Sequence, residues 1–367
     1  MGNTLSGGSS MKEPKFDESL LTVYPVEIRV GLGLVPMVQS DQFKASLNQV
    51  RRDLALGFGF LTPPIRVRDN QHLHPDAYDI KVKEWWIAQV QIDPSRLLAL
   101  DVNGASPLQG VGTTDPVFGL PSLWIRPELR AEAENLGSRV WEPGEVLASH
   151  LTEILMNFAP EFLGRDEVQA MIERLAKKRP TLAGELREAF SLGTIRQVLQ
   201  ALLDERVPIR DLATIGETLC DLATGDWDLD SLVNAARRAL RRTISGQYVN
   251  NEECIEVVDL SPDLVQRLSS HLNHNRFHLP REVQEQLIAR ISKAMIGKHS
   301  RSGESILFTP ETMRAPLRRL TRERHPEWVF LCAGDIAPEV RLQIVETLDL
   351  EENPQTEPAP ALACSQA

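Results

Sequence analysis

The sequence lacks the features of a secreted, membrane-spanning or zinc-binding chain. Its four cysteines lie far apart, with no C-x-x-C pair, so we expect neither a disulfide framework nor a thiolate zinc site. No apolar run approaches the roughly 18 residues that cross a bilayer, and no basic-then-apolar segment begins the chain. We therefore expect a chain that neither spans a membrane nor carries a secretory leader.

An excess of positive charge is also missing. The formal net charge is -11 at pH 7, whereas nucleic-acid binding needs a concentrated basic surface. Nucleic acid is therefore not expected as the main partner. Two arginine clusters support one alternative of a different functional class, a winged-helix-like nucleic-acid-binding regulator. Charged residues at helical spacing, however, usually form a solvated helix face. The clusters are Arg237, Arg238, Arg241 and Arg242, and Arg314, Arg318, Arg319, Arg322 and Arg324.

Motifs that carry catalysis or hold metals are likewise absent from the sequence. It contains no P-loop, no H-E-x-x-H and no G-x-S-x-G. Ser149 and His150 are neighbours on a predicted helix, where side chains point about 100° apart, so they make a poor nucleophile and base pair. His271, His274 and His278 have helical spacing that zinc ligands also use, but the residues around them indicate a fraying helix end. We expect a non-enzymatic protein with no cofactor and no metal.

Length and patterning indicate several folded parts. With 367 residues, 42% hydrophobic and 25% charged, the chain has the composition of a globular protein of about two to four domains. The predicted fold class is α+β with several subdomains: a small α/β subdomain with an inserted α+β subdomain, an all-helical, winged-helix-like subdomain and a C-terminal α/β subdomain. Their predicted bounds are 20–93 with 143–163, 94–142, 164–243 and 244–350, between a linker or tag at 1–19 and a disordered tail at 351–367.

Hydrophobic periodicity predicts the individual elements within these bounds. The predicted N-caps include Asp41 and Thr194, and the last two strands are expected to pair with each other. Predicted strands are 26–30, 63–70, 78–82, 86–92, 97–102, a short one near 140, 254–258, 306–308, 329–331 and 340–348. Predicted helices are 41–57, 127–137, one from 143, several within 164–243, 261–271, 280–296 and 310–324.

The stretch VGTTDPVFGLPSLWI, residues 111–125, stands out because it cannot be helical. Pro116 and Pro121 remove backbone donors, and glycines punctuate the turns. Asp115-Pro116 favours a turn with Val117 and Phe118 at or near its tip, where binding residues tend to lie. On this pattern alone, Phe118 and Leu120 could equally fold inward as a plug under the loop.

Five phrases stand in one order along the chain: GLGLVPMV, LNQVRRDLALGFGFLTPPIRVRDN, DPVFGLPSLWI, HLTEILMNFAPEFLGRDEVQ and VLQALLDERVPIRDLATIGETL. Together they resemble the cytoplasmic domain of the large export-gate family of type III secretion, which includes the flagellar FlhA and injectisome SctV proteins. The resemblance runs from about Val26 to Ile244 and more weakly to Leu350. PPIRVRDN, DPVFGLPSLWI and VPIRDL look more like the flagellar branch, whereas LATIGETL, Lys83-Glu84-Trp85-Trp86 and the tail depart from the family pattern.

The resemblance implies a docking platform at the cytoplasmic face of the bacterial inner membrane, joined to the membrane through an N-terminal part that this chain lacks. Such domains assemble into a ring, commonly nonameric, that binds export chaperones with their substrates and takes part in substrate switching. Other implied partners are the ATPase complex and the substrate-switch gate protein. The equivalent domain of a virulence injectisome is the alternative within the family.

The resemblance also implies a chaperone-binding site at Asp115 and Phe118 of the DPVF motif, completed by Pro116 and Val117. Ser149 stands where the flagellar proteins carry Thr in an A-T-H-L segment, a change that keeps the hydroxyl and loses a methyl. An aromatic anchor beside one carboxylate makes a small binding hot spot, with Phe118 as the anchor and Asp115 setting orientation. A cleft beside the inserted unit would suit a peptide with apolar anchors.

Overall fold

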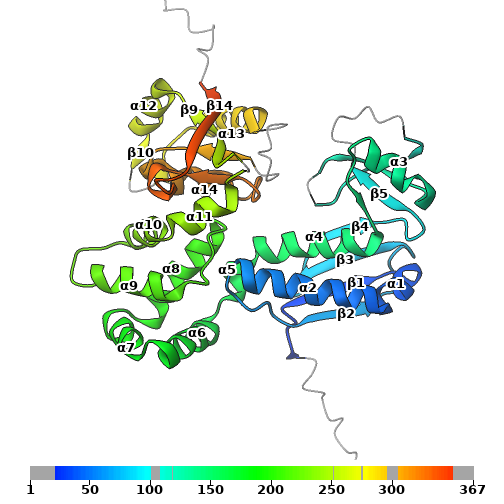
Figure 1. The fold of residues 1–367 in the computed structure, drawn as a ribbon, viewed down its shortest axis with the longest axis horizontal. Helices are drawn as coiled ribbons and strands as arrows, with labels where there is room; N and C mark the ends of the chain where they lie inside the picture. Colours follow the sequence, from blue (N-terminus) through cyan, green and yellow to red (C-terminus); the bar gives the residue numbers. More distant parts are fainter. Residues whose placement is uncertain are drawn as a thin grey trace, which may run out of the picture. The chain divides into compact units, whose positions relative to one another are not determined.

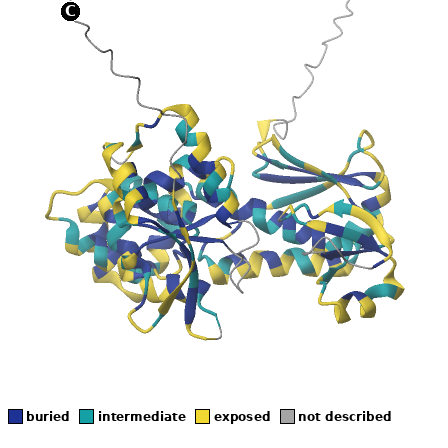
Figure 2. Ribbon diagram, turned by 90° about the horizontal axis from the view of Figure 1, so that it is seen from above, coloured by how far each residue is buried: buried dark blue, intermediate teal, exposed yellow. Residues whose placement is uncertain are grey.

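The computed structural model describes residues 21–100, 108–117, 119–250, 252–273, 276–295 and 305–349 (Figure 1). The chain divides into two compact units, each made of two segments. The first unit consists of Met1–Asn48 and Pro63–Leu151, and the second of Gln49–Thr62 and Thr152–Ala367. Buried residues concentrate on the strands and on one side of the helices that cover them (Figure 2). The finer division into four subdomains stays a prediction.

The first unit contains a mixed sheet in the order β2-β1-β3-β4. Its strands are β1 (Val26–Val30), β2 (Ile65–Asp69), β3 (Ala77–Val82) and β4 (Trp85–Gln91). β1 runs parallel to β2 and antiparallel to β3, and β3 forms a hairpin with β4. The predicted hairpin turn is confirmed at Lys83 and Glu84, which have φ values of 47° and 67°, the left-handed pair that matches strand twist in a tight hairpin.

The helical segments associated with this sheet are η2 (Leu32–Leu34), α1 (Val35–Gln39), α2 (Asp41–Gly57) and α4 (Pro143–Asn157). The predicted cap of α2 is wrong by one residue. Ser40 has extended backbone angles and its hydroxyl accepts a hydrogen bond from the Phe43 amide at 3.1 Å, so Ser40 caps the helix and Asp41 begins it. Both residue types suit an N-cap, and only the backbone conformation distinguishes them.

The inserted sheet of the first unit has the order β6-β7-β5-β8. Its strands are β5 (Leu97–Leu100), β6 (Gly110–Thr114), β7 (Pro121–Ile125) and β8 (Val140–Trp141), with η3 (Pro127–Leu129) and α3 (Arg130–Asn135). A small apolar core holds it together: Leu97, Ala99, Leu108, Ile125 and Ala133. Gly137, with φ 84°, ends α3 as predicted.

In the second unit, every element described between residues 159 and 248 is a helix, as the sequence predicted. These are α5 (Ala159–Phe162), α6 (Arg165–Lys178), α7 (Pro180–Ala189), α8 (Leu192–Asp204), α9 (Leu212–Leu222), α10 (Leu229–Ala239) and α11 (Arg241–Tyr248). The predicted cap at Thr194 is wrong, because Ser191 accepts the hydrogen bond from the Thr194 amide and α8 begins at Leu192.

The last part of the second unit is a parallel sheet in the order β13-β12-β9-β14. Its strands are β9 (Cys254–Leu260), β12 (Ile306–Phe308), β13 (Val329–Leu331) and β14 (Arg341–Leu348). The other elements are α12 (Pro262–Ser270), β10 (Leu272–Asn273), β11 (Arg276–Phe277), α13 (Arg281–Met295), α14 (Glu311–Thr321) and η4 (Ala333–Asp335).

The prediction that the last two strands pair with each other is wrong. β13 and β14 lie at opposite edges of this sheet, separated by β12 and β9. Consecutive strands are neighbours often enough to make the prediction reasonable. In a parallel sheet, however, each strand returns through a crossover, and the chain's periodicity carries no information about which edge it joins.

Candidate functional site

The candidate docking turn closes the hairpin of β6 and β7. The strands pair up to Thr114 opposite Pro121. Beyond that pair, the Asp115 amide donates to the Leu120 carbonyl at 2.9 Å, and the Gly119 amide donates to the Asp115 carbonyl at 3.0 Å. Gly119 has φ 68°, a left-handed conformation that glycine adopts without steric cost. The turn predicted from Asp115-Pro116 is confirmed.

The predicted contact residues differ in their exposure. Pro116 and Val117 form the turn and are half-buried, as is Ser149 on α4. Asp115 is only 1% exposed, although the sequence placed it beside an exposed aromatic ring. Phe118 lies outside the described residues, so its outward orientation, and the opposite possibility that it plugs the loop, both stay predictions.

Tyr78 is a second buried polar residue of the first unit. Tyr78, on β3, is 0% exposed. Burial raises the pKa of its hydroxyl well above the ordinary value, and the negative charge of Asp115 raises this pKa further.

His150 of α4 contacts the same tyrosine. Its Nδ1 atom lies 2.9 Å from the Tyr78 hydroxyl, and the two rings meet edge to face with centroids 5.9 Å apart. His150 is 8% exposed, so this hydrogen bond forms in the interior. From the sequence, His150 was considered only as a base for Ser149, and Tyr78 only as the first residue of the predicted strand 78–82. The signal in the sequence that could have indicated this contact was a polar residue at an inward position of the strand and of the helix.

His271 and His278 do not lie on one helix. α12 ends at Ser270 with His271 as its C-cap, and the hairpin of β10 and β11 follows. The His278 amide donates to the His271 carbonyl at 2.9 Å, which closes that hairpin. His274 lies outside the described residues. Within the part of the chain that is described, no three His, Cys, Asp or Glu side chains are placed to hold a metal ion.

The arginine clusters are only in part the solvated helix faces that the sequence indicated, because three of their members are buried. Arg237 of α10 and Arg314 and Arg318 of α14 are at most 6% exposed. Arg237 forms ion pairs with both Asp335 and Glu205, and Arg314 also pairs with Glu205. A buried charge is tolerated when it is paired. The positive charges of Arg237 and Arg314 are therefore paired with carboxylates inside the second unit.

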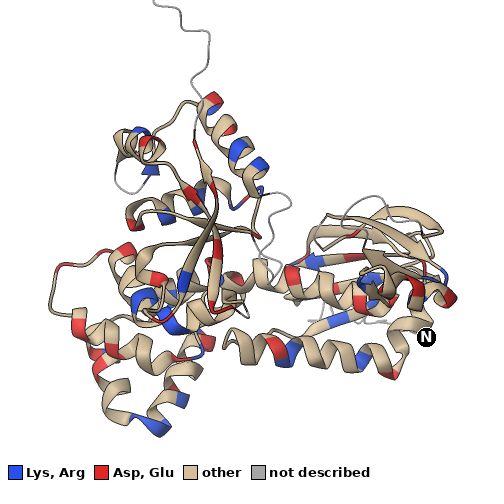
Figure 3. Cartoon of the chain, turned by 45° about the horizontal axis from the view of Figure 1, so that its top comes forward, with Lys and Arg blue, Asp and Glu red and all other residues tan. Residues whose placement is uncertain are grey.

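Other arginines of the two clusters form ion pairs nearer the surface. These pairs are Arg238 with Glu311, Arg242 with Glu339, Arg319 with Asp230 and Arg322 with Asp204. Basic and acidic residues are interspersed along the helices (Figure 3). The positive charge of the arginine clusters, which motivated the nucleic-acid-binding alternative, is thus largely balanced by acidic partners.

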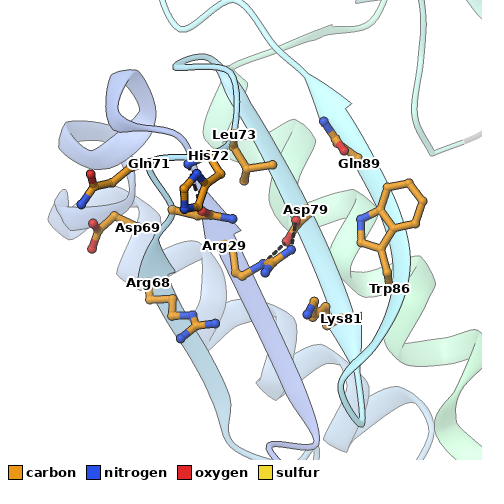
Figure 4. Close-up of a pocket in the computed structure, with 11 residues that line it drawn as sticks. Arg29, Arg68, Asp69, Gln71, His72, Leu73, Asp79, Lys81, Trp86 and Gln89 are labelled. Carbon is orange, nitrogen blue, oxygen red and sulfur yellow. Dashed lines mark hydrogen bonds and ion pairs between the residues drawn. The ribbon is translucent and has the colours of Figure 1, made fainter.

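A separate hollow of about 830 Å³ lies on the first sheet. Figure 4 shows Arg29 and Asp79 facing each other across β1 and β3 on this surface. Their ion pair is bidentate, with nitrogen to oxygen distances of 2.8 and 2.5 Å. Arg68, which also lines the hollow, pairs with Glu27 at 3.1 Å. None of the predicted docking residues lines this hollow.

The fold matches the cytosolic domains of type III secretion export gates. The Chlamydia pneumoniae CdsV protein, solved in complex with CdsO, superimposes with a TM-score of 0.79 at 25% identity, over 89% of this chain and 97% of that one. The nonameric SctV-C of EPEC gives a TM-score of 0.73 at 20% identity, over 89% and 98% of the two chains. At 20% identity, the likeness to SctV-C concerns the fold alone.

The chain belongs to the FHIPEP family, whose model matches residues 6–341. The flagellar biosynthesis protein FlhA of Bacillus subtilis is 30% identical over 349 residues, which is 93% of this chain and 52% of that protein. The chain therefore spans about half the length of this curated relative. The resemblance to the export-gate family, nearer its flagellar branch, is confirmed.

None of the helices among the described residues combines the length and the apolar character that a membrane span needs.

Proposed function

We propose that this chain is the partner-docking part of a flagellar type III export gate, and that it binds export chaperones carrying their substrates. The observation that carries the proposal is the hairpin turn at residues 115–120, in a chain of the family that includes flagellar FlhA. Pro116 and Val117 lie half-buried in this turn, and with Phe118 as the anchor they would suit an amphipathic or extended chaperone segment. The role is non-catalytic and includes a part in substrate switching.

The proposal assigns different tasks to the predicted site residues. Phe118 is the apolar anchor, and Pro116 and Val117 extend the surface around it. Ser149 supplies a hydroxyl on α4. Asp115, which is buried, acts on the shape of the turn rather than by direct contact with the partner. This assignment replaces the surface role that the sequence suggested for the carboxylate.

The chain's other proposed partners follow from its relatives. The relative SctV-C forms a nonamer, and CdsV forms a complex with CdsO. We extend these to a ring of this chain in the complete protein, held at the cytoplasmic face of the inner membrane, with the ATPase complex and the substrate-switch gate protein as further partners. The injectisome alternative is less favoured because the FlhA relative is 30% identical, against 20% for SctV-C.

The proposal is tested by titrating flagellar chaperone and substrate complexes into the folded chain. Replacing Phe118→Ala should weaken binding by about 30-fold, the effect of losing roughly 2 kcal/mol at a hot spot. Ile344→Ala is the matched control, because Ile344 is an apolar side chain, 56% exposed, in the second unit. Unchanged affinity for Phe118→Ala, in a protein with unaltered circular dichroism and melting temperature, would remove the proposed site.

A further inference from the structure

The two faces of the β2-β1-β3-β4 sheet differ in chemistry. Val26, Ile28 and Val30 of β1 are at most 1% exposed, whereas Glu27 and Arg29 between them point to the other face. The strand registers place polar and aromatic side chains of the neighbouring strands on that same face: Arg66, Arg68, Asp79, Lys81, Trp86 and Gln89. We call this surface, which carries the hollow of about 830 Å³, the charged face.

One ion pair in the hollow is neutral and fixed in geometry. Arg29 donates to both oxygens of Asp79 at 2.8 and 2.5 Å, and Asp79 is only 1% exposed. A bidentate pair of this kind orients the guanidinium plane. Because each charge neutralises the other, the binding properties of the charged face depend on its remaining charges.

Those remaining charges are unbalanced. The Glu27 carboxylate lies 3.1 Å from Arg68 Nε and 3.7 Å from Arg66 Nη1, so two arginines share one carboxylate. Lys81 lies opposite Glu27 in the strand register, yet it forms no ion pair with any of the described residues. Even with Asp69, which also lines the hollow, the surface has an excess of positive charge. A positive surface on a chain of net charge -11 attracts anionic groups locally.

An exposed tryptophan lies beside this positive charge. Trp86 is 54% exposed and lines the hollow, and it pairs with Lys81 across β3 and β4. Figure 4 shows Arg68, Arg29, Lys81 and Trp86, which come from the four strands of the sheet, one from each. Tryptophan and arginine are the residue types that contribute most to protein interfaces. The surface therefore has the chemistry of a binding site for a segment that carries both carboxylates and apolar side chains.

We propose that the charged face binds an acidic peptide segment of a partner protein. Carboxylates of the segment interact with Lys81 and with the guanidinium groups of Arg66 and Arg68, and an apolar side chain packs on Trp86. Nucleic acid is a less suitable partner, because the net charge of -11 repels a phosphate backbone. The charged face is separate from the docking turn, since no described residue of that turn lines the hollow.

The test is isothermal titration of the folded chain with a synthetic peptide of repeated Gly-Glu-Leu-Glu units and with its Gly-Gln-Leu-Gln counterpart. Only the acidic peptide should bind, and its affinity should fall as the salt concentration rises. For Lys81→Gln we expect about five-fold weaker binding, from the loss of one charged contact. Lys44→Gln is the matched control, because Lys44 lies on α2, pairs with Asp41 at 3.2 Å and does not line the hollow.

A second pair of variants tests the apolar contact. Trp86→Ala should weaken binding of the acidic peptide about ten-fold, the effect of removing an aromatic hot-spot side chain. Trp85→Ala is its control and should leave the affinity unchanged. Trp85 is 77% exposed, but it pairs with Val82 of the buried face and does not line the hollow. Unaltered melting temperatures would exclude unfolding as the cause of a weakened affinity.

Three outcomes would overturn the inference. Equal affinities for the acidic and the neutral peptide would show that carboxylates are not recognised. Equal weakening by Lys81→Gln and Lys44→Gln, or full affinity in Trp86→Ala, would show that binding does not occur on the charged face. Displacement of the acidic peptide by an equal concentration of inorganic phosphate or single-stranded DNA would show a general anion site in place of a peptide site.

Discussion

Single residues in the docking turn have distinct physical roles. Asp115 joins the two ends of the loop through its backbone hydrogen bonds to Leu120 and Gly119, and its side chain is buried. Gly119 allows the chain to reverse, because its φ of 68° lies in a region that residues with a Cβ rarely adopt.

Replacing Gly119→Ala tests this role of the backbone. An added Cβ would meet no atom within 4 Å, so the expected loss of about 1–2 kcal/mol in unfolding free energy comes from the left-handed conformation alone. The control is Gly246→Ala, in α11, where a Cβ also meets nothing within 4 Å. There alanine should stabilise by about 0.5–1 kcal/mol, because it favours a helix. Urea unfolding measures both, and a loss at both positions would contradict the argument.

Among the elements, α10, α14 and η4 are joined by buried charges. Arg237 donates to both oxygens of Asp335 at 2.8 Å, and the Asp335 carboxylate also accepts the Cys332 amide at 2.9 Å. The Ser245 hydroxyl of α11 donates to the Asp335 carbonyl at 3.2 Å. Because these elements come from the helical part and from the C-terminal sheet, the network makes the two parts of the second unit depend on each other.

Removing one charge of this network should be strongly destabilising. Asp335→Asn leaves the buried Arg237 without its main partner, and we expect a loss of about 3–5 kcal/mol in unfolding free energy. Glu339→Gln is the control, since Glu339 pairs with Arg242 at 2.8 Å on the surface and such a pair contributes little. Thermal and urea unfolding would show the contrast. Equal small effects would mean that the buried pair is not important for stability.

On the scale of the whole molecule, both units contain groups whose pKa values tie stability to pH. Burial raises the pKa of Asp335, but the charges and hydrogen bonds of Arg237 and Arg314 outweigh it, so the pKa lies below its ordinary value. Burial and Asp335 raise the pKa of Cys332 to about 11, and burial with Asp115 raises that of Tyr78. Asp335 should therefore limit stability at acidic pH, and Cys332 and Tyr78 should limit it at alkaline pH.

The expected unfolding free energy is therefore greatest from about pH 5 to pH 8. The contribution of Asp335 is present above its unfolded pKa of about 3.9 and is lost as the pH falls through the lower folded value. Those of Cys332 and Tyr78 are present below unfolded values of about 8.5 and 10, and are lost as the pH rises toward their folded values. Urea unfolding between pH 2.5 and pH 11 measures the profile.

Variants identify the origin of each limb of that profile. Asp335→Asn should flatten the acid limb, whereas Cys332→Ser and Tyr78→Phe should flatten the alkaline limb. An acid limb that keeps its slope in Asp335→Asn would show that other carboxylates dominate there.

Local patterns were sufficient for much of the fold. Alternation predicted β1 and the hairpin of β3 and β4, and the proline and glycine positions predicted the turn after Asp115, all of which the structure confirms. The errors concern choices that depend on distant residues. Ser40 rather than Asp41 caps α2, and β14 joins β9 instead of β13. Arg237 turns inward because Asp335, far along the chain, neutralises it.

The sequence by itself determined the family, many of the helices and strands, and the presence of a tight turn at the DPVF motif, because these depend on local residue types and on motifs read in order. It did not predict β6 and β7, the two strands that flank that turn. Only the tertiary structure decided that Asp115 lies inside and that His150 contacts Tyr78. It also decided that the arginines of α10 and α14 face acidic partners. The physical reason is that burial and charge pairing depend on which segments meet in space, and no local pattern in this chain encodes those meetings.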